Sequence, residues 1–257
     1  MVEETERENT QKIERFIHFI DNVSPFYNLS YEDLSFIKKN CAQIPPKITK
    51  NIENIDEELE SVKNFYKLDN YHYRQNYSNS CAIACYMMAR SNYLKNCPLP
   101  NKKLEGEILK DFENNVSIVK ILLLCLQENL NIKIFSELDY REIKFEEEWG
   151  EELRVNFLDF YEKNHKNKNI QFNFNQPLKQ KLLKKLLMNG ESILVNGLFY
   201  NIPHMRLVTG YNQNNFIIDD PIEYRKSQIG FSTLKQKSKP PLGQFFFSLT
   251  TKEINGE

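Results

Sequence analysis

Cys81 stands where a polar segment gives way to one that favours a helix. The stretch from Gln75 to Cys85 reads QNYSNSCAIAC, and the alanines and methionines after Cys81 predict a helix that runs from there to about Leu94. The free N–H groups and the dipole at a helix N-terminus stabilise a thiolate, which is the reactive form of cysteine. Cys81 is therefore a candidate nucleophile for acyl transfer.

A thiolate nucleophile of this kind needs a histidine, and the chain contains four: His18, His72, His165 and His204. His204 opens the predicted strand HMRLVTGY, and the next predicted strand, NNFIIDDP, ends in Asp219 and Asp220. In an antiparallel hairpin the start of one strand lies near the end of the next, so His204 is expected to lie near these acids. Neighbours on a strand point to opposite faces, so only one of the two can orient the imidazole.

Acyl transfer also needs hydrogen-bond donors for the charge that develops on the carbonyl oxygen. A backbone N–H at the start of the Cys81 helix is one such donor, and the side-chain amide of Gln75 is a candidate for the second. Asn79 or Ser80 suits the N-cap of the helix. Further residues near these positions are candidates for substrate contact, with packing or solvation as the alternative: Tyr77, Asn79, Ser80 and Arg206.

The elements that must position these residues change character along the chain. Apolar residues at three- and four-residue spacing predict an amphipathic helix around 13–23, and Ser30–Asp33 resembles a capping box that opens a second helix. Residues 140–175 are charged and are predicted to form an irregular insertion. Further helices are expected at 55–67, 116–130 and 177–190, and strands at 131–138, 191–200, 204–211, 214–221 and 244–250, with a hairpin at 212–215. Helices followed by antiparallel strands indicate the α+β class.

The pattern Q-x5-C at a helix start, the later H-x-x-x-V-x-G-Y and the strand ending in D-P resemble the papain-like cysteine peptidases. The likeness is greatest to the bacterial double-glycine leader peptidases, the bacteriocin-processing family, and to their stand-alone relatives. It covers about residues 71–230, interrupted at 140–175, and the chain departs from the family pattern at Ala82, where glycine is usual. The resemblance implies a papain-like fold with a helical lobe and an antiparallel sheet.

The same resemblance implies the residue roles. Cys81 would be the nucleophile, His204 the general base, Asp220 its orienting partner with Asp219 as the alternative, and Gln75 the oxyanion donor. Water as acceptor gives proteolysis, or deamidation of a glutamine side chain, and an amine gives transamidation or acyl transfer. A non-catalytic papain-like binding module is the alternative from another class.

The remaining cysteines carry less chemistry. Cys85 lies one helical turn after Cys81 and is expected to pack inward. Cys81 and Cys85 with Cys97 or His72 form a conceivable zinc set, but structural zinc sites favour CxxC-type pairs, and the chain has no second pair. No metal or other cofactor is expected.

Composition narrows the class of protein. The 257 residues carry a net charge of −1, so no bulk attraction to nucleic acid or an anionic membrane is expected. The sequence shows no apolar run long enough for a membrane span, no signal peptide and no disulfide framework, which favours a cytoplasmic protein, or one exported without a cleaved signal. We expect a helical extension at 1–65 and a catalytic domain at 66–257, acting on a peptide or protein and of undetermined oligomeric state.

Overall fold

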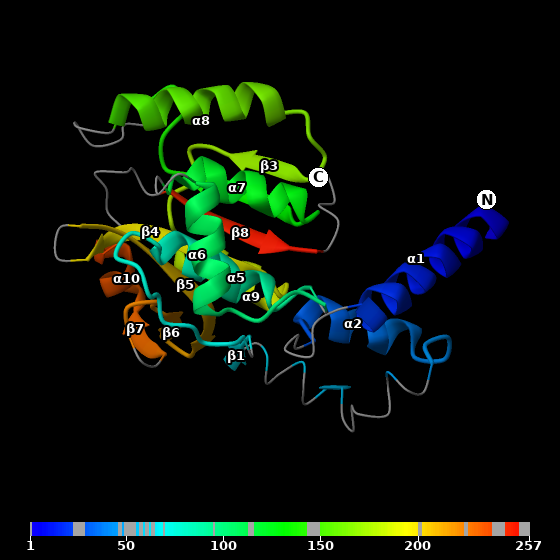
Figure 1. Cartoon of the computed structure of the whole chain (residues 1–257). Helices are drawn as coiled ribbons and strands as arrows, with labels where there is room; N and C mark the ends of the chain where they lie inside the picture. Colours follow the sequence, from blue (N-terminus) through cyan, green and yellow to red (C-terminus); the bar gives the residue numbers. More distant parts are fainter. Residues whose placement is uncertain are drawn as a thin grey trace.

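Helices dominate the first half of the chain and strands the second, which confirms the predicted α+β class (Figure 1). The computed structural model describes residues 2–22, 29–45, 48, 55–56, 59, 62, 65–68, 70–94, 96–112, 116–142, 150–199, 202–223, 226–237 and 245–251. In these parts the helices are α1 (Val2–Asn22), α2 (Tyr31–Asn40), α5 (Cys81–Arg90), α6 (Lys102–Asp111), α7 (Ile118–Gln127), α8 (Gly150–Asn164), α9 (Gln180–Met188) and α10 (Phe231–Lys237). None of these helices is long and apolar enough to cross a membrane.

One sheet joins all the described strands, and its order is β3-β2-β8-β4-β5-β6-β7 with β1 paired to β5. The neighbours pair antiparallel, as expected, except for β2 and β3, which are parallel. The hairpin expected at 212–215 is confirmed, and Gln213 adopts a positive φ of 48° in its turn. The strands are β1 (Phe65–Lys67), β2 (Asn131–Ser136), β3 (Ile170–Asn173), β4 (Ser192–Phe199), β5 (Ile202–Asn212), β6 (Asn215–Asp219), β7 (Ser227–Gly230) and β8 (Phe245–Thr250).

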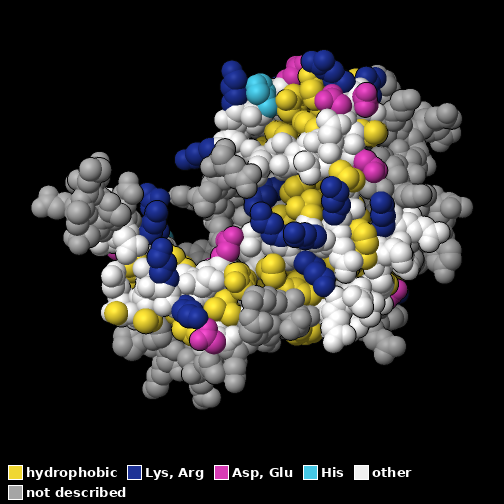
Figure 2. Space-filling view, turned by 180° about the vertical axis from the view of Figure 1, so that it is seen from behind, with side chains coloured by type: hydrophobic (Ala, Val, Ile, Leu, Met, Phe, Trp, Pro, Cys, Tyr) yellow, Lys and Arg dark blue, Asp and Glu magenta, His cyan; other side chains and the backbone are white. Residues whose placement is uncertain are grey.

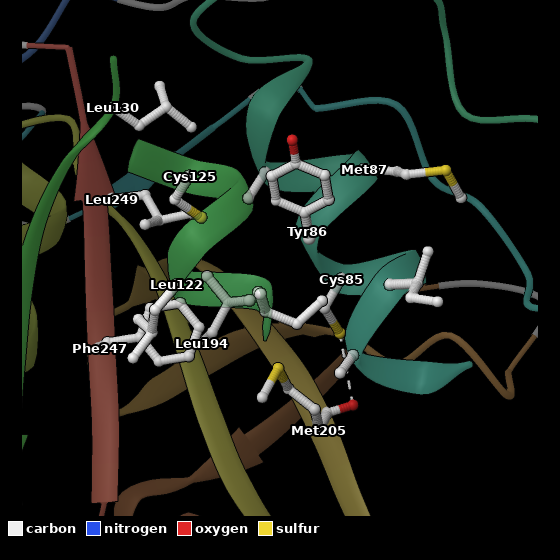
Figure 3. Close-up of a cluster of buried hydrophobic side chains, with 14 of the residues drawn as sticks. Cys85, Tyr86, Met87, Leu122, Cys125, Leu130, Leu194, Met205, Phe247 and Leu249 are labelled. Atoms are coloured by element: carbon white, nitrogen blue, oxygen red, sulfur yellow. Dashed lines mark hydrogen bonds between the residues drawn. The ribbon is translucent and has the colours of Figure 1, made fainter. Parts of the chain in front are cut away.

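Helices cover both faces of the sheet. Side chains of α5, α6 and α7 share one hydrophobic core with alternate residues of β2, β4, β5 and β8. Figure 3 shows part of this core, where Cys85 and Tyr86 of α5 lie near Leu122 and Cys125 of α7. Side chains of α9 and α10 form a second core with the other set of sheet residues. The α9 side of the molecule is seen in Figure 2, where Lys and Arg side chains gather near the middle.

The N-terminal helices connect to the sheet through a few contacts. The predicted capping box at the start of α2 is confirmed, since Asp33 N–H donates to Ser30 Oγ at 3.2 Å and Ser30 N–H donates to Asp33 at 2.8 Å. Helix α1 extends away from the body of the molecule (Figure 1). Leu34 and Val62 nevertheless belong to the same buried cluster as Val208 of β5, so this region shares part of its core with the sheet.

Two predictions of local structure were wrong. The helix expected at 55–67 does not reach its end, because Phe65–Lys67 forms strand β1 on the edge of β5. The segment predicted as irregular contains α8 and β3, because Phe157 and Phe160 pack into the core while charged side chains cover the outside. Helix α6, β7 and α10 were not predicted.

Strand β5 contains a bulge between Val208 and Gly210. A Cβ atom at Gly210 would lie 2.2 Å from the backbone oxygen of Tyr66 in β1. The absence of a side chain therefore lets β1 approach β5 closely.

Candidate active site

Cys81 is the first residue of α5, as predicted, although the helix ends at Arg90 rather than near Leu94. Cys81 is partly exposed, whereas every later residue of α5 is buried. Cys85 has no exposed surface, its thiol bonds to the backbone oxygen of Met205 at 3.4 Å, and burial raises its pKa well above the usual value. Of the two cysteines on this helix, Cys81 is therefore the one open to a substrate.

Ser80 occupies the N-cap position of α5, but its side chain does not cap the helix. Its Oγ instead lies 2.8 Å from the backbone oxygen of Tyr77 and within hydrogen-bond distance of the Glu105 carboxylate, and its one hydrogen can donate to either acceptor. The N–H groups of the first turn are therefore not used by a capping side chain. Such N–H groups can stabilise an anion at the helix start, where Cys81 lies.

His204, at the start of β5, contacts Asp220, just after β6. Its Nε2 lies 2.7 Å from Asp220 Oδ1, and both residues are buried, at 5% and 3% exposure. The other carboxylate oxygen accepts from Arg206 Nε at 2.8 Å, and the backbone N–H of Ile222 donates to Oδ1 at 3.1 Å. These three partners fix the carboxylate in orientation.

The electrostatics of this pair favour its charged form. Burial lowers the pKa of His204, but hydrogen bonds to Asp220 and Cys81 and the charges at both outweigh it, so the pKa is raised. Burial raises the pKa of Asp220, but the hydrogen bond and charge of His204, with Ile222 N–H and Arg206, hold it below its usual value. Because Nε2 faces Asp220, Nδ1 is the ring nitrogen left for the thiol of Cys81. The arrangement can therefore take a proton from a thiol and hold it.

Gln75 lies on the segment that leads into α5. Its backbone N–H donates to the oxygen of Pro221, next to Asp220, at 2.8 Å. Its side-chain amide nitrogen donates to Tyr77 O at 2.8 Å and makes a longer contact of 3.4 Å to Ser78 O, while Oε1 is buried with no partner among the described residues. One of the two amide hydrogens is thus only weakly engaged, and the oxyanion role of Gln75 stays a prediction.

The residues predicted to contact substrate lie in different environments. Ser80 is fully buried and Arg206 is 5% exposed, so both side chains lie inside the protein, and their contact with substrate stays a prediction. Alternation along β5 puts Arg206 on the same side as His204, where Asp220 binds it. Tyr77 is half-buried and packs beside α6, where a Cβ at Gly106 would lie 2.9 Å from its hydroxyl. Asn79 is exposed, and its role stays a prediction.

Asp219 makes a second set of contacts that the sequence did not indicate beyond the acid pair itself. It is fully buried, its carboxylate contacts His72 Nδ1, and it accepts from Asn70 Nδ2 at 2.9 Å. The ammonium of Lys226 lies 3.5 Å away. Neighbouring aspartates therefore hold two different histidines.

Glu105 of α6 is a third buried carboxylate near the site, after Asp219 and Asp220, and no sequence signal pointed to it. It is fully buried and accepts from Tyr73 Oη at 2.6 Å, from Asn76 N–H at 3.0 Å and from Ser80 Oγ. These donors belong to the residues around Gln75 and just before Cys81. Glu105 thus organises the loop that enters α5.

Within the described residues, no group of three or more His, Cys, Asp and Glu side chains is arranged to hold a metal ion. Two members of the conceivable zinc set have other partners, because Cys85 bonds to Met205 and His72 contacts Asp219.

Comparison with solved structures shows distant likenesses. One is to the peptidase domain of Streptococcus ComA, a bifunctional ABC transporter involved in a quorum-sensing pathway, with 12% identity and a TM-score of 0.41 over 73% of this chain and 99% of that one. Another is to a C39-like peptidase from Bacillus anthracis, with 15% identity and a TM-score of 0.25 over 29% of this chain and 48% of that one. No protein-family model and no curated protein matches the chain. Because both scores are low, residue roles are inferred from the chain's own contacts.

Proposed function

We propose that this chain is a papain-like cysteine hydrolase that cleaves peptide amides through a thioester on Cys81. One observation carries the proposal: the imidazole of His204 lies 2.7 Å from the buried carboxylate of Asp220 and also interacts with the side chain of Cys81. A thiol beside a histidine that is itself held by a buried carboxylate is the arrangement that activates a cysteine nucleophile.

In the proposed reaction, His204 takes the proton of Cys81, and the thiolate sulfur attacks the carbonyl carbon of the substrate amide. The oxyanion is stabilised by backbone N–H at the start of α5 and by Gln75. The C–N bond then breaks, the amine leaves with the proton from His204, and a thioester remains. Water, deprotonated by His204, attacks the thioester, releases the carboxylic acid and restores the thiol.

The nucleophile and base can be tested without knowing the substrate. We expect iodoacetamide to alkylate Cys81 at least about tenfold faster than the exposed Cys41 near pH 6, well below the usual pKa of a free thiol (about 8.5). His204→Ala should remove this advantage. Peptide mass spectrometry gives the rate at each cysteine.

His165→Ala is the matched control, because His165 is exposed and its ring contacts carbonyl oxygens of α8, the helix that ends just before it. It should leave the rate at Cys81 unchanged. If Cys81 in the wild type reacts no faster than Cys41, the proposed nucleophile–base pair is wrong.

The peptidase assignment needs a second measurement. A mixture of synthetic peptides of varied sequence is incubated with wild-type protein and with Cys81→Ala, and the products are analysed by mass spectrometry. New peptide termini in the wild-type sample alone support proteolysis. Conversion of glutamine side chains to glutamate without new termini would replace peptidase by deamidase.

A further inference from the structure

Residues 70–75 are hydrogen-bonded to residues 219–223, which form the end of β6 and the turn after it. The backbone N–H of Gln75 donates to Pro221 O at 2.8 Å, and Arg74 Nε donates to Ile222 O at 3.2 Å. We call these two segments and the bonds between them the seam. The seam joins the loop that carries the candidate oxyanion donor to the turn that begins with the two aspartates.

His72 lies in the middle of the seam and contacts the turn at two points. Its Nδ1 contacts the carboxylate of Asp219, and its Nε2 lies 3.2 Å from the backbone oxygen of Glu223. Asn70 adds a bond to the same carboxylate at 2.9 Å, and Lys226 Nζ lies 3.2 Å from Asn70 O. Three residues, Asn70, His72 and Lys226, thus converge on the carboxylate of Asp219.

Asp219 is able to anchor this seam because it is fully buried at the end of a strand. A buried carboxylate is costly unless it is paired, so its donors are held to it strongly. Two of these donors, Asn70 and His72, belong to the segment that leads to Gln75. The position of Gln75 therefore depends on Asp219, 144 positions later in the chain (219 − 75).

Asp220 lies in the turn of the seam, but its two side-chain partners, His204 and Arg206, belong to β5. His204 Nε2, Arg206 Nε and Ile222 N–H all contact its carboxylate, and none of these groups belongs to segment 70–75. Loss of His72 should therefore loosen Gln75 and leave the pair of His204 and Asp220 in place.

We infer that His72 and Asp219 are positioning residues that hold Gln75 where it can donate to the oxyanion. This inference rests on the proposed function, in which Gln75 is the second donor. Both histidine–aspartate pairs then serve the same proposed reaction. His204 and Asp220 activate the thiol of Cys81, whereas His72 and Asp219 position the donor that stabilises the oxyanion.

Two reagents separate these steps. Iodoacetamide reacts with the thiolate by displacement and forms no oxyanion on a carbonyl, so its rate reports the nucleophile and base. 4-Nitrophenyl acetate is attacked at its carbonyl carbon, an S–C bond forms, and the C–O bond breaks as 4-nitrophenolate leaves with the electron pair. The rate of this acylation is read from the absorbance of nitrophenolate, and it also depends on the donors that stabilise the oxyanion. The ratio of acylation rate to alkylation rate at Cys81 isolates those donors.

The ratio is measured for the full chain and its variants at one pH. Gln75→Ala should lower the ratio by about tenfold or more. His72→Ala and Asp219→Asn should lower it by about three- to tenfold, with alkylation nearly unchanged. His72→Gln, whose amide N–H can still donate to Asp219, should recover part of the loss, and His165→Ala should have no effect.

Each outcome has a distinct meaning. If Cys81 of the wild type reacts no faster than Cys41 with either reagent, the proposed function itself fails. If Gln75→Ala leaves the ratio unchanged, Gln75 is not a donor, and this inference is overturned together with that role. If Gln75→Ala lowers the ratio and neither His72→Ala nor Asp219→Asn does, the inference alone is overturned. Should Asp219→Asn fail to fold, His72→Ala decides, because His72 is partly exposed.

Discussion

Two histidine–aspartate pairs lie at the end of β6, and they differ in how far their side chains are exposed to solvent. The side chains of His204 and Asp220 are 3% and 4% exposed, whereas His72 is 24% exposed beside a fully buried Asp219. His204 of the first pair also interacts with the thiol of Cys81, whereas His72 contacts Asp219 and the backbone oxygen of Glu223. A histidine and a carboxylate in contact are therefore not enough to define a catalytic site, and the third group decides which pair can activate a nucleophile.

The cations of the two pairs differ as well. Asp220 accepts from the guanidinium of Arg206 at 2.8 Å, and both are buried. Asp219 has the ammonium of Lys226 at 3.5 Å, and Lys226 is 18% exposed. A planar guanidinium holds a carboxylate in one orientation, whereas a lysine on a flexible stem does so less firmly. We interpret the pair of His204 and Asp220 as rigid. We interpret the pair of His72 and Asp219 as the contact that holds the loop of Gln75 in position.

The largest expected difference is in stability. Arg206→Met removes the guanidinium that binds the buried carboxylate of Asp220 and should lower the free energy of unfolding by about 3–5 kcal/mol. Lys226→Met should cost less, about 1–2 kcal/mol, because the ammonium is farther away and partly in water. Urea denaturation measures both. The double variant Arg206→Met with Asp220→Asn should recover much of the loss, and equal costs for the two single variants would contradict the distinction between the pairs.

The second difference is in the reactivity of Cys81. Asp220→Asn removes the carboxylate whose hydrogen bond and charge help to raise the pKa of His204, and it should slow alkylation near pH 6 by about tenfold to a hundredfold. Asp219→Asn should slow it by less than about threefold, since it acts on Gln75 and not on the base. Iodoacetamide labelling followed by mass spectrometry gives the alkylation rate at Cys81 in both variants. A larger decrease for Asp219→Asn than for Asp220→Asn would mean that the two acids have the opposite roles.

The third difference is in the pH dependence of stability. The pKa of Asp220 is lowered in the folded state, so its contribution is present above its unfolded pKa and is lost as the pH falls through the folded value. The pKa of His204 is raised, so its contribution is present below its unfolded pKa and is lost as the pH rises through the folded value. The stability advantage of wild type over Asp220→Asn should thus be greatest between about pH 4 and 6.5. Urea titrations from acid to mildly alkaline pH test this, and a constant advantage across the range would be inconsistent with it.

The smallest expected effect is local. His72→Ala should speed hydrogen exchange of the Gln75 N–H, which donates to Pro221 O, by about three- to tenfold, because the seam opens more often. Amides of α7, which lies outside the seam, should exchange as in the wild type. Hydrogen exchange is measured by NMR or mass spectrometry. Equal protection of the Gln75 N–H in wild type and in His72→Ala would contradict the proposed role of His72 in the seam.

Local patterns in the sequence sufficed for much of the framework. The helix that begins at Cys81, the capping box of α2 and the hairpin between β5 and β6 were all predicted, because each depends on residues within a few positions of one another. The proximity of His204 to an aspartate followed from the same hairpin. Helix α8 and β3 were missed because their charged residues hide the few that pack inward.

Contacts between distant segments were decided by the tertiary structure alone. Alternation along β6 required Asp219 and Asp220 to diverge, but only the register of β5 against β6 determined that Asp220 meets His204 and Arg206. Two of the partners of Asp219 lie 147 positions away at His72 and 149 positions away at Asn70. Propensity and periodicity describe neighbours along the chain, and contacts at such separations arise only when packing of the whole core brings the segments together.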